Sequence, residues 1–141
     1  MKKLFLGLIA LIFLAGCQSG KYEKVKAENG VVKIPVSKVS DGNIHYYEYD
    51  DNGKPVKFFV LQSNDGTIRA AFDACDVCYP EKKGYRQESD FVICNNCGQR
   101  FHESKINVQK GGCNPAPLNR SVNGSFLEIQ VADIKKGSFY F

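Results

Sequence analysis

The sequence has little helical periodicity, few histidines and no recognisable set of hydrolytic residues. After residue 17 no apolar run is long enough to cross a membrane, and no long segment there repeats apolar residues with the helical period. Histidine occurs only as His45 and His102, and no Ser/His/Asp set or carboxylate pair stands out as a hydrolytic centre. These absences favour a mostly β domain and give no support to a hydrolytic enzyme.

The charge of the chain indicates no polyanionic partner. Nineteen Lys and Arg residues face fifteen Asp and Glu residues, which gives a formal net charge of +4. No basic stripe with interleaved aromatic residues occurs, so we expect no nucleic-acid partner. A chain of 141 residues with one short leader suits a single domain with a modest core.

The N-terminus has the composition of a bacterial export signal. Residues 1–3 are short and positive, residues 4–14 are apolar apart from one glycine, and the segment ends in Leu-Ala-Gly-Cys at Cys17. This ending resembles a lipobox, in which the cysteine becomes lipid-modified. We therefore expect a lipoprotein signal peptide over residues 1–16 and acyl chains such as palmitate on Cys17. More than one acyl chain would hold the protein stably on the extracytoplasmic face of the cell membrane.

Residues 17–30 are polar and charged, and we expect them to form a tether between the membrane and the domain. The domain itself is expected to cover residues 31–141. Its last aromatic residues, Phe139 and Phe141, are expected to pack at the end of the fold.

Aromatic and β-branched segments separated by Asx-Gly turns predict the fold class. Residues 44–49, 56–61 and 68–72 are strand-like, and turn sequences at 50–53 and 64–66 lie between them. Strands that alternate with such turns indicate an antiparallel meander. We expect a small, mainly β domain whose sheet is a meander or barrel-like.

The other segments predict further strands and at most one short helix. Residues 31–36 read as a strand that Pro35 places at a sheet edge, and residues 91–93 read as a short strand. The short helix is expected over residues 101–108. Alternating apolar residues at 127–131 predict a late strand.

Five cysteines after Cys17 carry the chemistry of the domain. Two C-x2-C pairs, Cys75/Cys78 and Cys94/Cys97, are separated by fifteen residues, and Cys113 follows after fifteen more. Two such pairs can form a four-sulfur tetrahedral cage, and this spacing falls in the range typical of metal sites. We interpret the pattern as a cysteine-rich metal-binding loop region.

Other kinds of site that use paired cysteines fit this sequence less well than a metal cage does. Five thiols cannot all form disulfides within one chain, although an exported protein would permit them. Covalent haem needs a histidine after the pair, a bacterial ferredoxin needs a denser cysteine run, and a Rieske site needs histidines inside the pairs. A thioredoxin-type dithiol needs a following helix, which the sequence does not predict. A rubredoxin-like or zinc-ribbon-like site remains, or a variant that includes Cys113.

The roles of the accessory residues stay open at this point. Cys113 could replace one of the four thiols, serve a second metal, cap a site whose occupancy changes, or be a free buried cysteine. His102 lies five residues after Cys97 and is either a ligand, a second-shell donor or a solvated side chain. Asp73 and Asp76 flank the first pair and either shape its charge or cap the turn.

The strings AFDACDVCY, CNNCG-x2-F and GCNPAPL together resemble the FtrD-like membrane iron–sulfur family over about residues 44–141. The resemblance implies a metal-binding envelope domain linked to bacterial iron handling, which passes electrons or metal to a membrane partner protein. It implies as ligand candidates Cys75, Cys78, Cys94, Cys97 and Cys113. The chain departs from the longer members in having a lipid anchor where they have transmembrane helices.

The export signal bears on the identity of the metal. Exported iron–sulfur proteins usually cross the membrane folded by the twin-arginine route, whereas this signal begins Lys2-Lys3 without an arginine pair. Thiolates also suit mononuclear iron, zinc or copper(I). We expect iron or an iron–sulfur centre in an iron-acquisition carrier. The alternatives are a structural-zinc domain that binds another envelope protein and a dithiol oxidoreductase.

Overall fold

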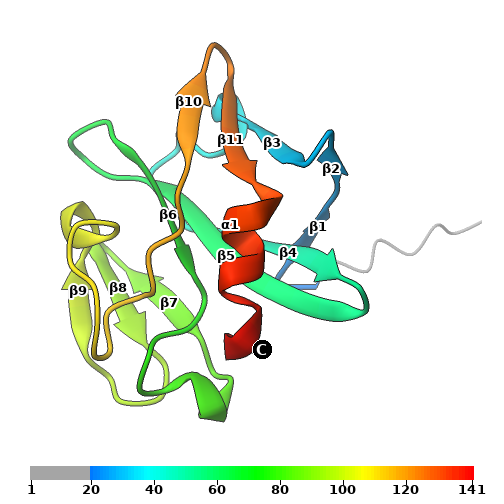
Figure 1. Cartoon of the computed structure of the whole chain (residues 1–141). Helices are drawn as coiled ribbons and strands as arrows, with labels where there is room; N and C mark the ends of the chain where they lie inside the picture. Colours follow the sequence, from blue (N-terminus) through cyan, green and yellow to red (C-terminus); the bar gives the residue numbers. More distant parts are fainter. Residues whose placement is uncertain (1–19) are drawn as a thin grey trace, which may run out of the picture.

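Residues 20–141, the part of the chain that this computed structural model describes, form three small sheets and one α-helix (Figure 1). The mainly β class is confirmed. The sheets do not close into a barrel, so the barrel-like alternative is wrong. Within the described residues, no helix is both long enough and apolar enough to span a membrane.

The predicted meander forms the central sheet. Strands β4 (His45–Asp51), β5 (Lys54–Gln62) and β6 (Ile68–Phe72) pair antiparallel in chain order, and β1 (Glu23–Val25) adds to β4 in parallel. The β4–β5 hairpin turns at Gly53, whose φ of 88° suits glycine, and the Gly53 N–H donates to the Asp50 carboxylate at 2.6 Å.

The central sheet is buried on both faces because β5 and β6 carry apolar residues at successive positions. Val56, Phe58 and Val60 of β5 point into one hydrophobic cluster, while Phe59 and Leu61 point into a second. An apolar run without polar alternation is typical of a strand covered on both sides. The central sheet therefore separates two cores, and the second core includes cysteines.

The first core lies between the central sheet and a sheet in the order β10-β11-β3-β2. These strands are β2 (Ala27–Glu28), β3 (Val31–Pro35), β10 (Ser121–Asn123) and β11 (Phe126–Gln130). The α-helix α1 (Val131–Lys136) follows β11 and places Ile134 in the same core.

The third sheet consists of β7 (Tyr85–Glu88), β8 (Phe91–Cys94) and β9 (Arg100–His102), paired antiparallel in chain order. It lies beside the central sheet on the side away from β2 and β3 (Figure 1). Its apolar residues pack into the second core, which makes it the support for the cysteine loops.

The helix forms at a different place from the one predicted. Residues 101–108 contain the end of β9 and a single 3-10 turn, η3 (Glu103–Lys105). The chain leaves this turn at Asn107, whose φ is 68° and whose side chain bonds the backbone of Ala70. The left-handed residue and its tertiary bonds end the turn before a helix can form.

The N-terminal segment is more ordered than a tether. Residues 20–30, which we expected in the polar tether, contain β1 and β2. Lys21 Nζ lies 3.0 Å from Asp73 Oδ2, and the Tyr22 hydroxyl donates to the same oxygen at 2.5 Å. Asp73 is buried, so its carboxylate requires these partners. The predicted acylation site Cys17 lies outside the described residues.

The packing of the two C-terminal aromatic residues is also uneven. Phe141 packs against the first core, whereas Phe139 packs outside both cores and is 60% exposed. Phe139 instead lies against the rings of Tyr79 and Tyr140 at the surface.

We predict that Gly84→Ala destabilises the protein far more than Gly124→Ala. Both glycines have φ near 60°, so alanine costs about 1–2 kcal/mol of strain at either position. A Cβ at Gly84 would lie within 2.7 Å of the buried Asp73 carboxylate, whereas a Cβ at Gly124 meets nothing within 4 Å. Denaturant unfolding of the two variants should differ by at least about 2 kcal/mol. Equal losses would contradict the close packing at Asp73.

Candidate metal centre

The first cysteine pair follows directly from β6. Cys75 is buried in the second core, and the backbone N–H of Cys78 donates to Cys75 Sγ at 3.1 Å. The chain then makes the 3-10 turn η2 (Tyr79–Glu81), which is only three residues long. This turn offers no helix N-terminus of the kind that activates a thioredoxin-type dithiol.

The second pair lies in a tight turn between β8 and β9. Cys94 is the last residue of β8 and is buried, whereas Cys97 is exposed. The Gly98 N–H donates to the Cys94 carbonyl at 2.9 Å, and the φ of 74° at Gly98 is one that glycine adopts readily. The local pattern Cys-Asn-Asn-Cys-Gly is therefore sufficient to build this turn.

The third loop brings Cys113 to the same place. Two consecutive glycines, Gly111 and Gly112, have positive φ and turn the chain toward the other pairs. The loop is fixed to the first pair because the Ala116 N–H donates to the Ala74 carbonyl at 2.9 Å.

The five thiols fall into two groups that share one member. The inner group consists of Cys75, Cys78 and Cys94, and the outer group of Cys78, Cys97 and Cys113. Within each group the sulfur atoms all lie within 4.8 Å of one another, and Cys78 Sγ is 3.8 Å from Cys113 Sγ. The structure thus brings together all five predicted ligands. The two groups cut across the second sequence pair, although the Cys94 and Cys97 side chains also interact.

Tyr85 connects the three loops. Its backbone N–H donates to Asp73, two residues before Cys75, and it pairs with Cys94 across β7 and β8. Its hydroxyl donates to the Cys113 carbonyl at 2.7 Å. Burial raises the pKa of Tyr85 far above its usual value, and the hydrogen bond with the Cys75 side chain raises it further. The Tyr85 hydroxyl therefore stays protonated.

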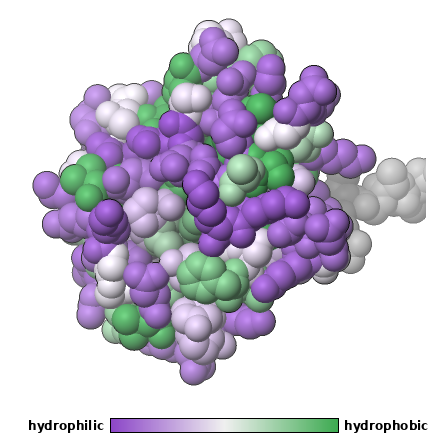
Figure 2. All heavy atoms as spheres, viewed as in Figure 1, coloured by the Kyte–Doolittle hydropathy of each residue, from purple (hydrophilic) through white to green (hydrophobic). Residues whose placement is uncertain are grey.

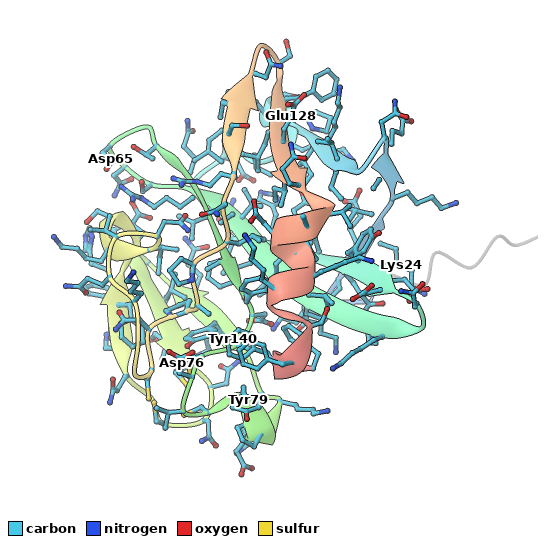
Figure 3. All side chains as sticks on the ribbon, in the orientation of Figure 1. Lys24, Asp65, Asp76, Tyr79, Glu128 and Tyr140 are labelled. Carbon is cyan, nitrogen blue, oxygen red and sulfur yellow. The ribbon has the colours of Figure 1, made fainter. Side chains whose placement is uncertain are left out.

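A small cavity of about 90 Å³ adjoins the inner group and is lined by all three of its cysteines. Lys57, Lys82 and Lys83 also line it. Tyr79 of the first cysteine loop and Tyr140 and Phe141 of the C-terminal end also line the cavity. Asp76, Tyr79 and Tyr140 lie together below α1 (Figure 3). The Tyr140 hydroxyl donates to Asp76 Oδ1 at 2.6 Å.

The thiols differ in acidity according to their surroundings. Burial raises the pKa of Cys94 to about 11. A side-chain hydrogen bond with Cys97, followed by burial, raises the pKa of Cys113 to about 12. The backbone N–H of Gln99 lowers the pKa of Cys97 below its usual value. Cys97 therefore combines exposure with the greatest thiolate character of these three.

The two histidines contact residues other than the thiols. His102 Nδ1 lies 2.9 Å from Ser104 Oγ, and its ring meets Phe91 edge-on. His45 Nε2 lies 2.7 Å from Asp41 Oδ1. Neither histidine belongs to the two groups of thiols.

Several residues at the site had no local signal in the sequence. Lys21 and Tyr22 reach Asp73 from more than fifty positions away, and Tyr140 reaches Asp76 from sixty-four positions away. Only the tertiary fold places them beside the cysteine loops.

We predict that iodoacetamide modifies Cys97 first in the metal-free protein at neutral pH, because it is exposed and its pKa is lowered. Cys75 and Cys94 should react slowest because they are buried. Peptide mass mapping of timed samples would give the order. Modification of Cys75 ahead of Cys97 would contradict the arrangement of the two groups.

Comparison with known proteins identifies two features of the chain. The model of the family "Membrane iron-sulfur containing protein FtrD-like" matches residues 39–141. The model of the prokaryotic membrane lipoprotein lipid attachment site matches residues 1–18, which include Cys17. The search of curated proteins gives no match.

Among solved structures, one similarity is to the quaternary ammonium Rieske monooxygenase CntA in complex with the inhibitor MMV12. It has 13% identity, a TM-score of 0.46, and covers 69% of this chain but only 29% of that chain. The two family matches are the informative ones, since the first covers most of the chain and both cysteine pairs. The protein is a lipid-anchored, membrane-associated member of the family of FtrD-like membrane iron–sulfur containing proteins.

Proposed function

We propose that this lipoprotein carries electrons or metal ions in bacterial iron acquisition, from the extracytoplasmic face of the cell membrane. The observation that carries the proposal is the convergence of five thiols from three loops into two groups with sulfur separations below 4.8 Å. The centre would hold iron or an iron–sulfur group through Cys75, Cys78, Cys94, Cys97 and Cys113.

The donor set suits such a group. All five donors are sulfur atoms, and thiolates favour iron–sulfur, zinc or copper(I) chemistry over the hard cations. Thiolate-bound iron supplies one-electron redox chemistry when it is present. The Cys78 N–H bond to Cys75 Sγ stabilises negative charge on that sulfur, and such hydrogen bonds tune the potential of a bound centre.

The number of thiols in each group favours a carrier over a purely structural zinc site. Structural zinc sites close the ion within four protein ligands, whereas functional sites keep a position open. Each group here has three sulfur atoms. An ion held by the inner group would keep a free position for exchange, electron transfer or an incoming ligand, and the adjacent cavity provides space for one.

The anchor would keep the centre close to the membrane. Only Gln18 and Ser19 separate Cys17 from the first described residue, and three Cα–Cα steps span at most about 11 Å. Lys21 is then bound to Asp73, two residues from Cys75. A short connection of this kind supports transfer to a partner within the membrane rather than to a distant one.

The surface near the first pair offers apolar contacts to such a partner. Val77, between Cys75 and Cys78, is 61% exposed, and Phe139 lies exposed beside Tyr79. Elsewhere the surface is mostly hydrophilic, with small separate apolar patches on the face shown in Figure 2. Exposed apolar side chains beside a candidate redox centre support docking of an envelope redox or iron-transport protein.

We predict that the lipoprotein purified from its native membrane contains iron, absorbs visible light and gives a reversible voltammetric wave. Cys75→Ser should remove most of the metal and lower the melting temperature, since metal binding and folding are coupled in small domains. Elemental analysis and thermal unfolding would measure both effects.

Two control variants should leave the metal content unchanged. Val77→Ser alters an exposed residue inside the same pair, and His102→Ala removes a ring that bonds Ser104 rather than a thiol. A colourless protein with stoichiometric zinc and no redox wave would favour the structural-zinc domain instead. Reducible disulfides and no metal would favour a dithiol oxidoreductase.

A further inference from the structure

We infer that the turn of the second cysteine pair is a docking surface for the acidic face of a redox partner protein. This inference rests on the proposed function, because it names the chemistry of the partner that would exchange electrons with the centre. The surface is a basic rim beside the exposed thiol of Cys97, and we define it as Lys82, Lys83, Arg86 and Arg100. All four cationic residues are exposed.

The two asparagines of the Cys-Asn-Asn-Cys turn hold two of these cations at the second pair. Lys83 Nζ donates to Asn96 Oδ1 at 3.1 Å. Arg86 Nη1 donates to Asn95 Oδ1 at 3.1 Å, and the Asn95 side-chain amide donates to the Lys83 carbonyl at 2.9 Å. Since both asparagines directly precede Cys97 in the chain, these bonds place two positive charges beside the exposed thiol.

The topology of the third sheet gathers the cations at one of its ends. Strand β7 starts at this end, β8 finishes there in Cys94, and β9 starts there again. Arg86 and Arg100 both pair with Ile93, from opposite sides, so the three side chains share one face of the sheet. Val92 and Cys94 alternate with Ile93 and belong to the second core, so the arginines lie on the outer face.

The acidic residues near the rim only partly offset its charge. Glu88, closer to the turn between β7 and β8, forms ion pairs with the two arginines of the rim at 2.8 Å and 3.7 Å. The two lysines of the rim form no ion pair with any described residue. Four cations against Glu88 and the neighbouring Glu81 leave a net charge of +2. A surface of this charge attracts anionic partners and repels cationic ones.

The rim lies at the part of the centre that a partner can approach most closely. Cys97 is exposed, whereas Cys75 and Cys94 are buried and Cys78 and Cys113 are half-buried. An acidic protein held by the rim would therefore lie against the most accessible thiol of the centre. A lipid surface over the rim would cover this thiol instead, so a protein partner fits the rim better than anionic headgroups do.

The test compares two oxidants of opposite charge on the full lipoprotein, purified with its metal in neutral detergent. The reduced centre loses one electron to ferricyanide, which becomes ferrocyanide, or to tris(phenanthroline)cobalt(III), which becomes the cobalt(II) complex. Stopped-flow absorption would measure both rates. We expect the ferricyanide rate to fall at least about fivefold from low to high salt and the cobalt rate to rise, because salt screens the charge of the rim.

Two double variants that lose the same charge separate the rim from the net charge of the protein. Lys83→Gln with Arg86→Gln should lower the ferricyanide rate at low salt at least about fivefold and raise the cobalt rate. Lys24→Gln with Lys26→Gln removes two exposed charges near β1 and should change either rate much less. The visible spectrum and the reduction potential should keep their wild-type values in both, which would show that the centre is intact.

The outcomes separate the inference from the proposed function. Equal effects of the two double variants, or a rim variant that slows both oxidants alike, would overturn the docking surface and leave an electron carrier. The difference between the wild type and the rim variant should persist in vesicles that contain phosphatidylglycerol. Its loss there would assign the rim to anionic lipid and overturn the protein partner. A centre that neither oxidant can oxidise overturns the electron-carrying function together with this inference.

Discussion

The buried carboxylate of Asp73 is the interaction on which the arrangement of the centre depends. It accepts from the N–H of Tyr85 and is bound by Lys21 and Tyr22, so one side chain joins the end of β6, the start of β7 and the N-terminal segment. Tyr85 in turn pairs with Cys94 and bonds the Cys113 loop. Three loops that are distant in sequence are thereby held around a small volume before any metal contributes.

The two-sided burial of β5 explains why the centre lies where it does. One face of the central sheet builds an ordinary core with β3, β11 and α1. The other face builds a smaller core that contains Cys75 and Cys94 and supports the β7–β9 sheet. Since a core of this size stabilises little by itself, metal bound to its cysteines would add a substantial part of the stability of that half of the protein.

Features with a local cause could be predicted from the sequence, and features with a tertiary cause could not. Asx-Gly turns and strand-like runs predicted β4, β5 and β6, and cysteine spacing predicted that the two C-x2-C pairs converge, whereas Cys113 was a ligand candidate only through the family resemblance. The helix was misplaced because the tertiary bonds of Asn107 stop the turn that begins at Glu103. The docking of Lys21 and Tyr22 on Asp73, and the approach of Cys113 to Cys78, depend on contacts across more than thirty residues.

The chain combines a lipid attachment site with a cluster of thiols, and a family member built in this way would work at the membrane surface. The most direct test of the central claim is X-ray absorption at the metal edge of the lipoprotein purified from its native membrane. Convergence of the five thiols on one centre predicts a first shell of sulfur alone at about 2.3 Å. A first shell dominated by oxygen or nitrogen, in a protein with full metal content, would contradict it.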